Sequence, residues 1–187
     1  MQTVAKPITH VEFRAMAFSE AEEKAYIFEL INGEIAAKNH PTATHQRVLR
    51  RLSSLFDAHV SEARLGEVFF APFGVVPELN TDVQPDLFVV LYANLPNLRE
   101  EGFFGAPDIA LEILSPSSIK SDRNTKFKLY ERAGVGEYWI VDPKNQSIEV
   151  YSRVNGAFEM MSVAAETGAV ASSVLPGFGV AVAEIFA

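Results

Sequence analysis

The chain has 187 residues, 48% hydrophobic and 21% charged, which is enough to bury the core of a single domain spanning residues 1–187. It contains no cysteine, which excludes disulfides, thiolate zinc sites and a cysteine nucleophile. A net charge of −8 argues against tight non-specific binding to nucleic acid, because such binding needs Lys and Arg to neutralise phosphates. Without an apolar leader or a membrane-length apolar run, we expect a soluble cytoplasmic protein with no membrane partner.

The first third of the chain is predicted to contain two helices and a hairpin. Residues 9–12 have the form of a capping box, so a helix is expected to begin there and run towards Ala25. Asn32-Gly33 lies between apolar runs within 26–36, which is typical of a β-hairpin. Apolar residues recur at three- and four-residue steps over 43–60 and predict an amphipathic helix. Its other face carries Arg47, Arg50 and Arg51.

The rest of the chain is predicted to be mainly strands. Short strands are expected at 68–70 and 74–76, and longer buried strands at 86–91 and 107–114. A helix over 122–133 should end at Gly134, before strands at 137–141, 148–151 and 158–163, the last two forming a meander. This order predicts an α/β fold (α+β, with a mixed sheet) in which helices flank a central sheet.

Two acids stand out because their neighbours are apolar. Glu112 lies inside a predicted core strand, and Asp86 opens another directly after Pro85. A charge in a core strand costs several kcal/mol unless something pairs with it. Two such carboxylates on adjacent strands suit Mg²⁺, which favours one or two carboxylates together with water and phosphate oxygens. The plainer interpretations are a structural ion pair for Glu112 and a strand-start aspartate for Asp86.

A third candidate is Lys126, which shares an apolar helix face with Tyr130. A lysine directed inward near two carboxylates could hold a scissile phosphate, although a lysine stem that covers apolar surface is equally compatible. Supporting candidates are His45, Glu29 and Asp108. Each has a plainer interpretation: a packing histidine, a strand residue whose side is undetermined, and an aspartate that begins a strand.

Other catalytic motifs are absent from the sequence. It has no GxxxxGK[ST], GxGxxG after a strand, GxSxG or HExxH, and its histidines lack zinc spacing. Basic residues cluster on the arginine-bearing helix and after Glu112. The second cluster consists of Lys120, Arg123, Lys126 and Lys128. If both clusters flank the two acids, they would form a positive groove on an acidic protein.

The segments 107–117 and 134–143, with Asp122, Lys126 and Tyr130 between them, form a distinctive pattern. This pattern resembles the Uma-two family of restriction-endonuclease-like proteins. Weaker resemblances are the hairpin at 26–34, His45, Gln84-Pro85-Asp86, and the ending at 175–178 and 185–186. The resemblance implies a PD-(D/E)xK fold in which Asp86 and Glu112 match the metal-binding acids. Leu114 occupies the place of the usual lysine, and the resemblance implies that Lys126 supplies it from the following helix.

The leading hypothesis is an endonuclease that uses Mg²⁺ or Mn²⁺ to hydrolyse phosphodiesters of nucleic acid, with DNA as the expected partner. Asp86 and Glu112 would hold the metal, Lys126 would neutralise phosphoryl charge, and His45 or Glu29 would orient water or a second metal. The acidic net charge and the missing lysine favour an alternative, a nuclease fold used as a nucleic-acid- or partner-binding module. A hydrolase of other phosphodiesters is a third interpretation. A homodimer through Phe103-Phe104 or the C-terminal meander is compatible with the sequence.

Overall fold

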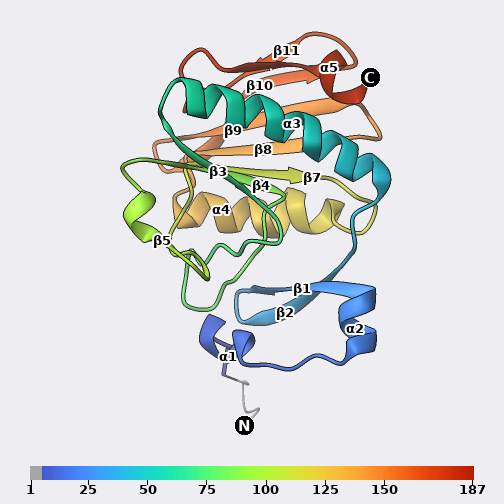
Figure 1. Cartoon of the computed structure of the whole chain (residues 1–187), viewed down its shortest axis with the longest axis vertical. Coiled ribbons are helices and arrows are strands. Elements are labelled where there is room, and N and C mark those ends of the chain that lie inside the picture. Colours follow the sequence, from blue (N-terminus) through green and yellow to red (C-terminus); the bar gives the residue numbers. More distant parts are fainter. Residues whose placement is uncertain (1–5) are drawn as a thin grey trace.

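The computed structural model describes residues 6–187 and is built around a six-stranded sheet (Figure 1). The strand order is β10-β9-β8-β7-β4-β3. The strands are β3 (Gly66–Phe70), β4 (Leu87–Leu91), β7 (Ile109–Ile113), β8 (Glu137–Asp142), β9 (Ser147–Val154) and β10 (Ala157–Ala165). β7 and β8 run parallel and the other neighbours run antiparallel, so the predicted mixed sheet is confirmed.

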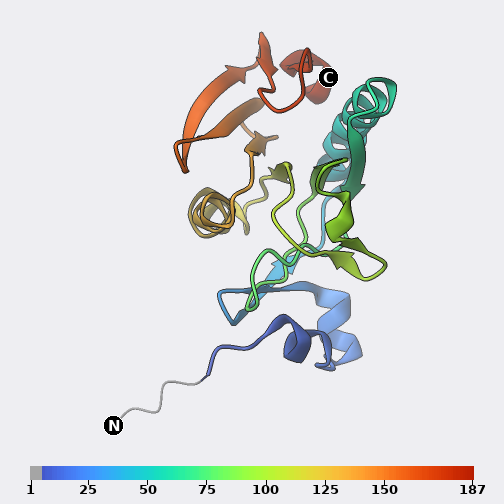
Figure 2. The ribbon, with the colours of Figure 1, turned by 90° about the vertical axis from the view of Figure 1, so that its left-hand side faces the viewer.

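Helices cover both faces of this sheet, as Figure 2 shows. Helix α3 (Ala43–Glu62) packs Leu52 and Phe56 on one face, against the odd-numbered residues of β7 and β8. On the other face, a π-helix η2 (Ser121–Lys126) continues into α4 (Phe127–Ala133). The prediction of one regular α-helix over 122–133 was therefore wrong for its first half. The wider π turns direct both Asp122 and Lys126 inward, and both are buried.

The N-terminal region contains two short helices and the predicted hairpin. The single helix expected from 9 towards Ala25 is instead α1 (His10–Arg14) and α2 (Glu20–Ala25). Each helix begins with its own capping box, Thr9 with Glu12 and Ser19 with Glu22, so the second box starts a new helix where a continuation was expected.

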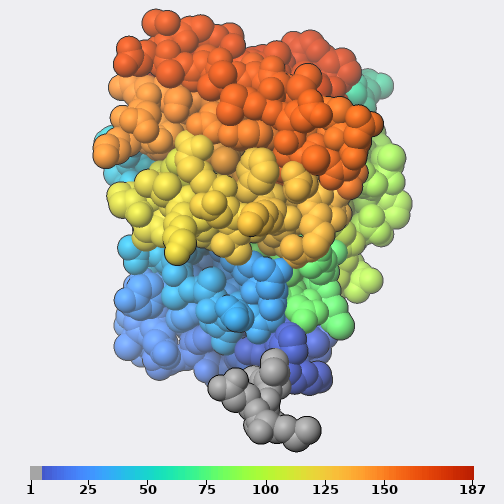
Figure 3. All heavy atoms as spheres, turned by 180° about the vertical axis from the view of Figure 1, so that it is seen from behind, coloured from blue at the N-terminus to red at the C-terminus, as the bar shows by residue number. Residues whose placement is uncertain are grey.

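The hairpin joins β1 (Tyr26–Ile31) to β2 (Glu34–Asn39). Asn32 and Gly33 both have positive φ, 54° and 82°, as the tight turn of a hairpin requires. The hairpin and the C-terminal elements lie at opposite ends of the molecule, with the η2–α4 segment between them (Figure 3). The hairpin therefore lies next to the helix that carries Lys126.

The remaining elements are short. They are η1 (Leu95–Asn97), β5 (Leu98–Arg99), β6 (Gly102–Phe103), β11 (Ala169–Ala171), β12 (Gly179–Ala181) and α5 (Val182–Phe186). In place of the strand expected at 74–76, Val75 forms two isolated β-bridges, one to Val83 and one to Phe103. Phe103 is fully buried and Phe104 half-buried, whereas Met160, Met161 and Val163 on β10 are exposed, and a homodimer stays a prediction. Across residues 6–187, no helix has both the length and the apolar character needed to cross a membrane.

Candidate active site

The pairing of β4 with β7 brings the two predicted acids together. Leu87 pairs with Leu111, and one step further along the antiparallel register places Asp86 opposite Glu112. Both acids are buried, with 8% and 2% of their surface exposed. Side chains alternate along a strand, so Asp86 points to the same face of the sheet as Phe88, and Glu112 to the same face as Ala110. Phe88 and Ala110 pack on the η2–α4 face. The acids therefore face the helix that carries Lys126.

Lys126 bridges two of the buried carboxylates. Its Nζ donates to Oε1 of Glu112 at 2.8 Å and to Oε1 of Glu29 at 3.0 Å. Oδ1 of Asp122, four residues earlier in the chain, lies 4.0 Å from the same nitrogen. The Tyr130 hydroxyl, one turn further along, also donates to Oε1 of Glu112 at 2.8 Å. One oxygen of Glu112 is thus held by two buried donors.

The hairpin contributes the other half of the site. Glu29 of β1 is 3% exposed, and its Oε1 accepts a hydrogen bond from the backbone N–H of Gln84 at 2.8 Å. Lys38 of β2 donates to the same Oε1 at 3.2 Å and to the Gln84 carbonyl oxygen at 3.0 Å. These contacts join the hairpin to the segment that leads into Asp86.

Asp86 is fixed by the start of α3 and by the neighbouring strand. Nε2 of His45 lies 3.0 Å from Oδ2 of Asp86, and the backbone N–H of Ile113 donates to that same oxygen at 2.7 Å. Thr42 caps α3 by accepting from the backbone N–H of His45, which sets the position of the histidine. The structure thus places His45 against Asp86 and links Glu29 to Glu112 through Lys126.

Burial and neighbouring charge divide the acids of the site into two groups. Burial raises the pKa of Glu112 to about 8, against the attraction of Lys126 and with repulsion from Asp122 and Asp86. Burial also raises the pKa of Asp122. For Glu29, burial raises the pKa, but the charges of Lys126 and Lys38 outweigh it and the net shift is downward. For Asp86, burial also raises the pKa, but the hydrogen bond and charge of His45 outweigh it, so the pKa is lowered. The site therefore favours ionised Glu29 and Asp86, and a proton on Glu112.

The oxygens left free by these bonds fit a hard divalent cation. Within residues 6–187, no hydrogen bond uses Oδ1 of Asp86 or Oε2 of Glu112. Carboxylate oxygens are the ligands that Mg²⁺ and Mn²⁺ prefer, and Mg²⁺ commonly takes only one or two from the protein. In the same part of the chain, no three His, Asp or Glu side chains converge as a ready-made metal cage. The residues present therefore fit a cation held by Asp86 and Glu112 with water or substrate oxygens completing its shell.

Unpartnered polar atoms gather around the same place. Among the described residues, four fully buried side-chain atoms lack a hydrogen-bond partner. Three of them are Nδ1 of His45, Oε1 of Gln84 and Oδ2 of Asp122. Buried polar atoms are normally satisfied, and a clustered exception indicates a place for water or an ion.

Asp108 does not join this group, which corrects the expectation that it could serve as an extra ligand. Its Oδ2 accepts from the backbone N–H of Leu91 at 2.7 Å, and its Oδ1 accepts from Asn94 at 2.9 Å. It precedes β7, four residues from Glu112 and hence about 13 Å along an extended strand. Asp108 is a structural residue at the far end of that strand.

The predicted positive groove is also not formed as expected. Arg123 is bound by both oxygens of Glu149, at 2.9 and 2.7 Å, and Arg51 donates to the backbone carbonyl of Ile185. Lys126 is buried within the acids. Arg123 and Lys126 are therefore paired with acids, and Arg51 is bound to a backbone carbonyl, so these three residues are not free to form the predicted groove.

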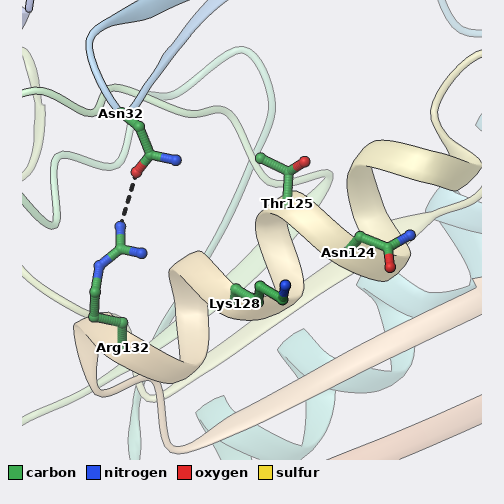
Figure 4. A pocket seen from close by; sticks show the side chains of 5 residues that line it. All are labelled: Asn32, Asn124, Thr125, Lys128 and Arg132. Atoms are coloured by element: carbon green, nitrogen blue, oxygen red, sulfur yellow. Dashed lines mark hydrogen bonds between the residues drawn. The ribbon is translucent and has the colours of Figure 1, made fainter.

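A polar hollow of about 270 Å³ lies beside the helix that carries Lys126. It is lined by Asn32, Asn124, Thr125, Lys128 and Arg132 (Figure 4). Arg132 points to the hairpin turn, where it donates to Asn32 at 2.9 Å, and it also holds Glu78 through two bonds. None of the candidate acids lines this hollow, so it is separate from the acid cluster, which consists of Glu29, Asp86, Glu112 and Asp122.

Sequence reasoning missed the contributions of Tyr130, Lys38, Asp122 and Gln84. Helical spacing did place Tyr130 on the face of Lys126, but its hydrogen bond to Glu112 was not expected. Lys38 had no such indication, since β2 alternates between half-buried and exposed positions and its lysine resembles an ordinary surface residue.

Comparisons with known proteins agree with this fold. A family model described as "Putative restriction endonuclease" (Uma2) matches residues 11–183. An uncharacterised protein of Synechocystis, sll1609, is 28% identical over 139 residues, covering 72% of this chain and 75% of that protein. The crystal structure of a "putative nuclease belonging to DUF820" from Anabaena variabilis superposes with a TM-score of 0.77 at 22% identity, covering 96% of this chain and 98% of that one. The matched span includes every residue of the acid cluster, and the chain belongs to the Uma2 family.

Proposed function

We propose that the protein is a metal-dependent nuclease that hydrolyses phosphodiester bonds of DNA, with Asp86 and Glu112 as metal ligands. The observation that carries this proposal is the opposed pair of buried carboxylates beside a buried lysine, each carboxylate with one oxygen that accepts no hydrogen bond from residues 6–187. Membership of a family described as restriction endonucleases supports the reaction class. The choice of DNA rests on that description.

Each residue has a distinct task in this proposal. Asp86 and Glu112 would hold Mg²⁺ or Mn²⁺ through Oδ1 and Oε2. When bound, such an ion lowers the pKa of a water and polarises a phosphoryl oxygen. Lys126 offsets the charge of Glu29 and the charge that Glu112 gains when a metal ion displaces its proton, and its buried ammonium favours nearby negative charge during phosphoryl transfer without contacting the phosphate. His45 orients Asp86 through the 3.0 Å contact, so its free oxygen stays available.

The proposal is tested by cleavage of supercoiled DNA, single-stranded DNA and RNA with Mg²⁺, Mn²⁺ or EDTA. Wild type is compared with Asp86→Asn and Glu112→Gln, which keep the side-chain shape while removing the anionic ligand. We expect metal-dependent cutting of DNA by wild type, and a loss of at least about 10²-fold in either variant, the scale typical for groups that stabilise the transition state. Asp108→Asn is the matched control, because it changes an aspartate at the far end of β7 and should keep wild-type activity.

The outcomes separate the alternatives. Full activity in Glu112→Gln would refute the assignment of the site. Absence of cutting on every nucleic acid, with Mn²⁺ binding retained, would favour the binding-module alternative. That alternative has its own support, because Lys126 is enclosed by two carboxylates and Leu114 fills the usual lysine position.

A further inference from the structure

The two lysines of the site differ in what their ammonium groups can still reach. Lys126 has 2% of its side chain exposed, and its Nζ is surrounded by Glu112, Glu29 and Asp122. Its Nζ donates to Glu112 and Glu29, while Oδ1 of Asp122, at 4.0 Å, lies beyond hydrogen-bonding distance, so burial is what separates this ammonium from solvent. Without a rearrangement of the buried acids, Lys126 cannot touch a phosphate that arrives from solvent.

Lys38 differs from Lys126 in its exposure to solvent. Its Nζ donates to Oε1 of Glu29 and to the backbone carbonyl of Gln84, which uses two of its three donors. Within the part of the chain that the structure describes, the third donor has no protein partner. Its side chain is 20% exposed, about tenfold more than that of Lys126.

The charge of Lys38 also reaches the candidate metal ligands. It lowers the pKa of Asp86 and of Glu29, and it partly counteracts the burial that raises the pKa of Glu112. Lys38 shares Oε1 of Glu29 with Lys126, which in turn donates to Glu112, and it contacts Gln84 two residues before Asp86. Because Lys38 belongs to the hairpin and contacts the segment just before Asp86, it forms part of the rim between these acids and solvent.

We propose that Lys38 is the residue that contacts a phosphate of the nucleic-acid substrate, while Lys126 stays with the buried acids. This inference rests on the proposed function and adds a substrate-binding residue to it. The third N–H of Lys38 donates to a non-bridging phosphate oxygen beside the position taken by the scissile bond. The existing bonds to Glu29 and Gln84 hold the ammonium in place, so little side-chain entropy is lost on binding.

A purely structural Lys38 would show the same ion pair, so the test needs a measurement that pairing alone does not change. Each phosphate neutralised by a lysine adds about 0.9 to the slope of log affinity against log salt for duplex DNA, and about 0.7 for single strands. Binding of fluorescent oligodeoxynucleotides is measured by anisotropy in EDTA, over a series of salt concentrations. Wild type is compared with Lys38→Gln, Lys38→Arg and Lys128→Gln.

The expected pattern is specific. Lys38→Gln should weaken binding and reduce the magnitude of the slope by about one phosphate contact. Lys38→Arg keeps the charge and should keep the slope. Lys128→Gln removes an exposed lysine that lines the separate hollow, and should also leave the slope unchanged. Circular dichroism confirms that each variant is folded before its binding is interpreted.

The result also separates this inference from the nuclease proposal. A slope that falls only in Lys38→Gln supports the phosphate contact whether or not wild type cleaves DNA. An unchanged slope, or no DNA binding by wild type, overturns the contact. Metal-dependent cleavage by wild type in that case would leave the nuclease proposal standing.

Discussion

The ammonium of Lys126 donates a 2.8 Å hydrogen bond to Oε1 of Glu112, and both side chains are almost completely buried. Lys126 also holds Glu29 at 3.0 Å, so it is shared between the sheet and the hairpin. Removing one partner of a buried ion pair leaves an uncompensated charge, which typically costs about 3–5 kcal/mol. We therefore expect Lys126→Met to lower the free energy of unfolding by that amount, measured by urea denaturation.

The matched control for this variant is Lys128→Met. It changes an exposed lysine two residues away, and surface substitutions usually stay within about 0.5 kcal/mol. A loss below about 1 kcal/mol in Lys126→Met, on the scale of an exposed ion pair, would show that the lysine does not stabilise the buried acids.

Tyr130 is expected to position Glu112 for metal binding. Its hydroxyl donates to Oε1 of Glu112 at 2.8 Å, which leaves Oε2 for a cation. Loss of a residue that orients a metal ligand typically costs about 10–100-fold in affinity. Tyr130→Phe should show that loss for Mn²⁺ by calorimetry while keeping the fold.

Tyr138→Phe is the control for Tyr130→Phe. Tyr138 is equally buried and packs on Tyr130 with ring centroids 5.0 Å apart, but its hydroxyl donates to the backbone carbonyl of Asp122. It should keep wild-type Mn²⁺ affinity. Equal losses in the two variants would mean that packing, rather than the bond to Glu112, sets the affinity.

Local chemistry was sufficient to predict much of the fold. The Asn32-Gly33 turn, the apolar spacing of α3 and the apolar runs of β4 and β7 each determine an element from neighbouring residues alone. Glu112 was conspicuous because an acid inside a core strand needs a partner. Its pairing with Asp86 followed from placing the two strands side by side.

The features that were not predicted depend on long-range packing. Glu29 lies on a strand of a two-stranded hairpin, and alternation alone cannot decide which side of such a hairpin is covered. Lys38 reaches the acids only because the hairpin docks beside Gln84, far away in sequence. The π turns of η2 likewise depend on what Asp122 and Lys126 meet in the core.

A second buried acid, Glu137, is expected to be structural. It is fully buried on the opposite face of the sheet, and its donors among the residues that the structure describes are all neutral. Those donors are Nε1 of Trp139, Oγ of Ser152, Oγ of Ser172, and both N and Oγ of Ser173. Glu137→Gln replaces an accepting oxygen by a donor that faces these donors. It should cost on the order of 3 kcal/mol, at the upper end for a hydrogen bond to a charged group.

The control for Glu137→Gln is Ser152→Ala, which removes a single donor. It should cost about 1 kcal/mol by urea denaturation. Both variants should keep wild-type Mn²⁺ affinity, because neither residue belongs to the acid cluster that contains Asp86. A fall in Mn²⁺ affinity in either variant would show that the two faces of the sheet are coupled.

The raised pKa of Glu112 predicts how stability depends on pH in the metal-free protein. Folding keeps a proton on Glu112 up to about pH 8, whereas the unfolded chain releases it near the ordinary value of 4.5. The folded state therefore binds more protons between these values, and the contribution of Glu112 to stability falls as pH rises from 4.5 to 8. Glu112→Gln cannot lose that proton, so it should be more stable than wild type by on the order of 5 kcal/mol at pH 8.5.

Urea denaturation in EDTA at pH 5 and pH 8.5 measures this difference. The advantage of Glu112→Gln should be small at pH 5 and large at pH 8.5, and added Mg²⁺ should reduce it by stabilising only wild type. Glu67→Gln, at an exposed position on β3, should follow wild type at both pH values. If Glu112→Gln and wild type showed the same pH dependence, Glu112 would already be ionised in the fold through its pairing with Lys126. Metal binding would then release no proton from Glu112, and the metal affinity of the site would vary little between pH 6 and 8.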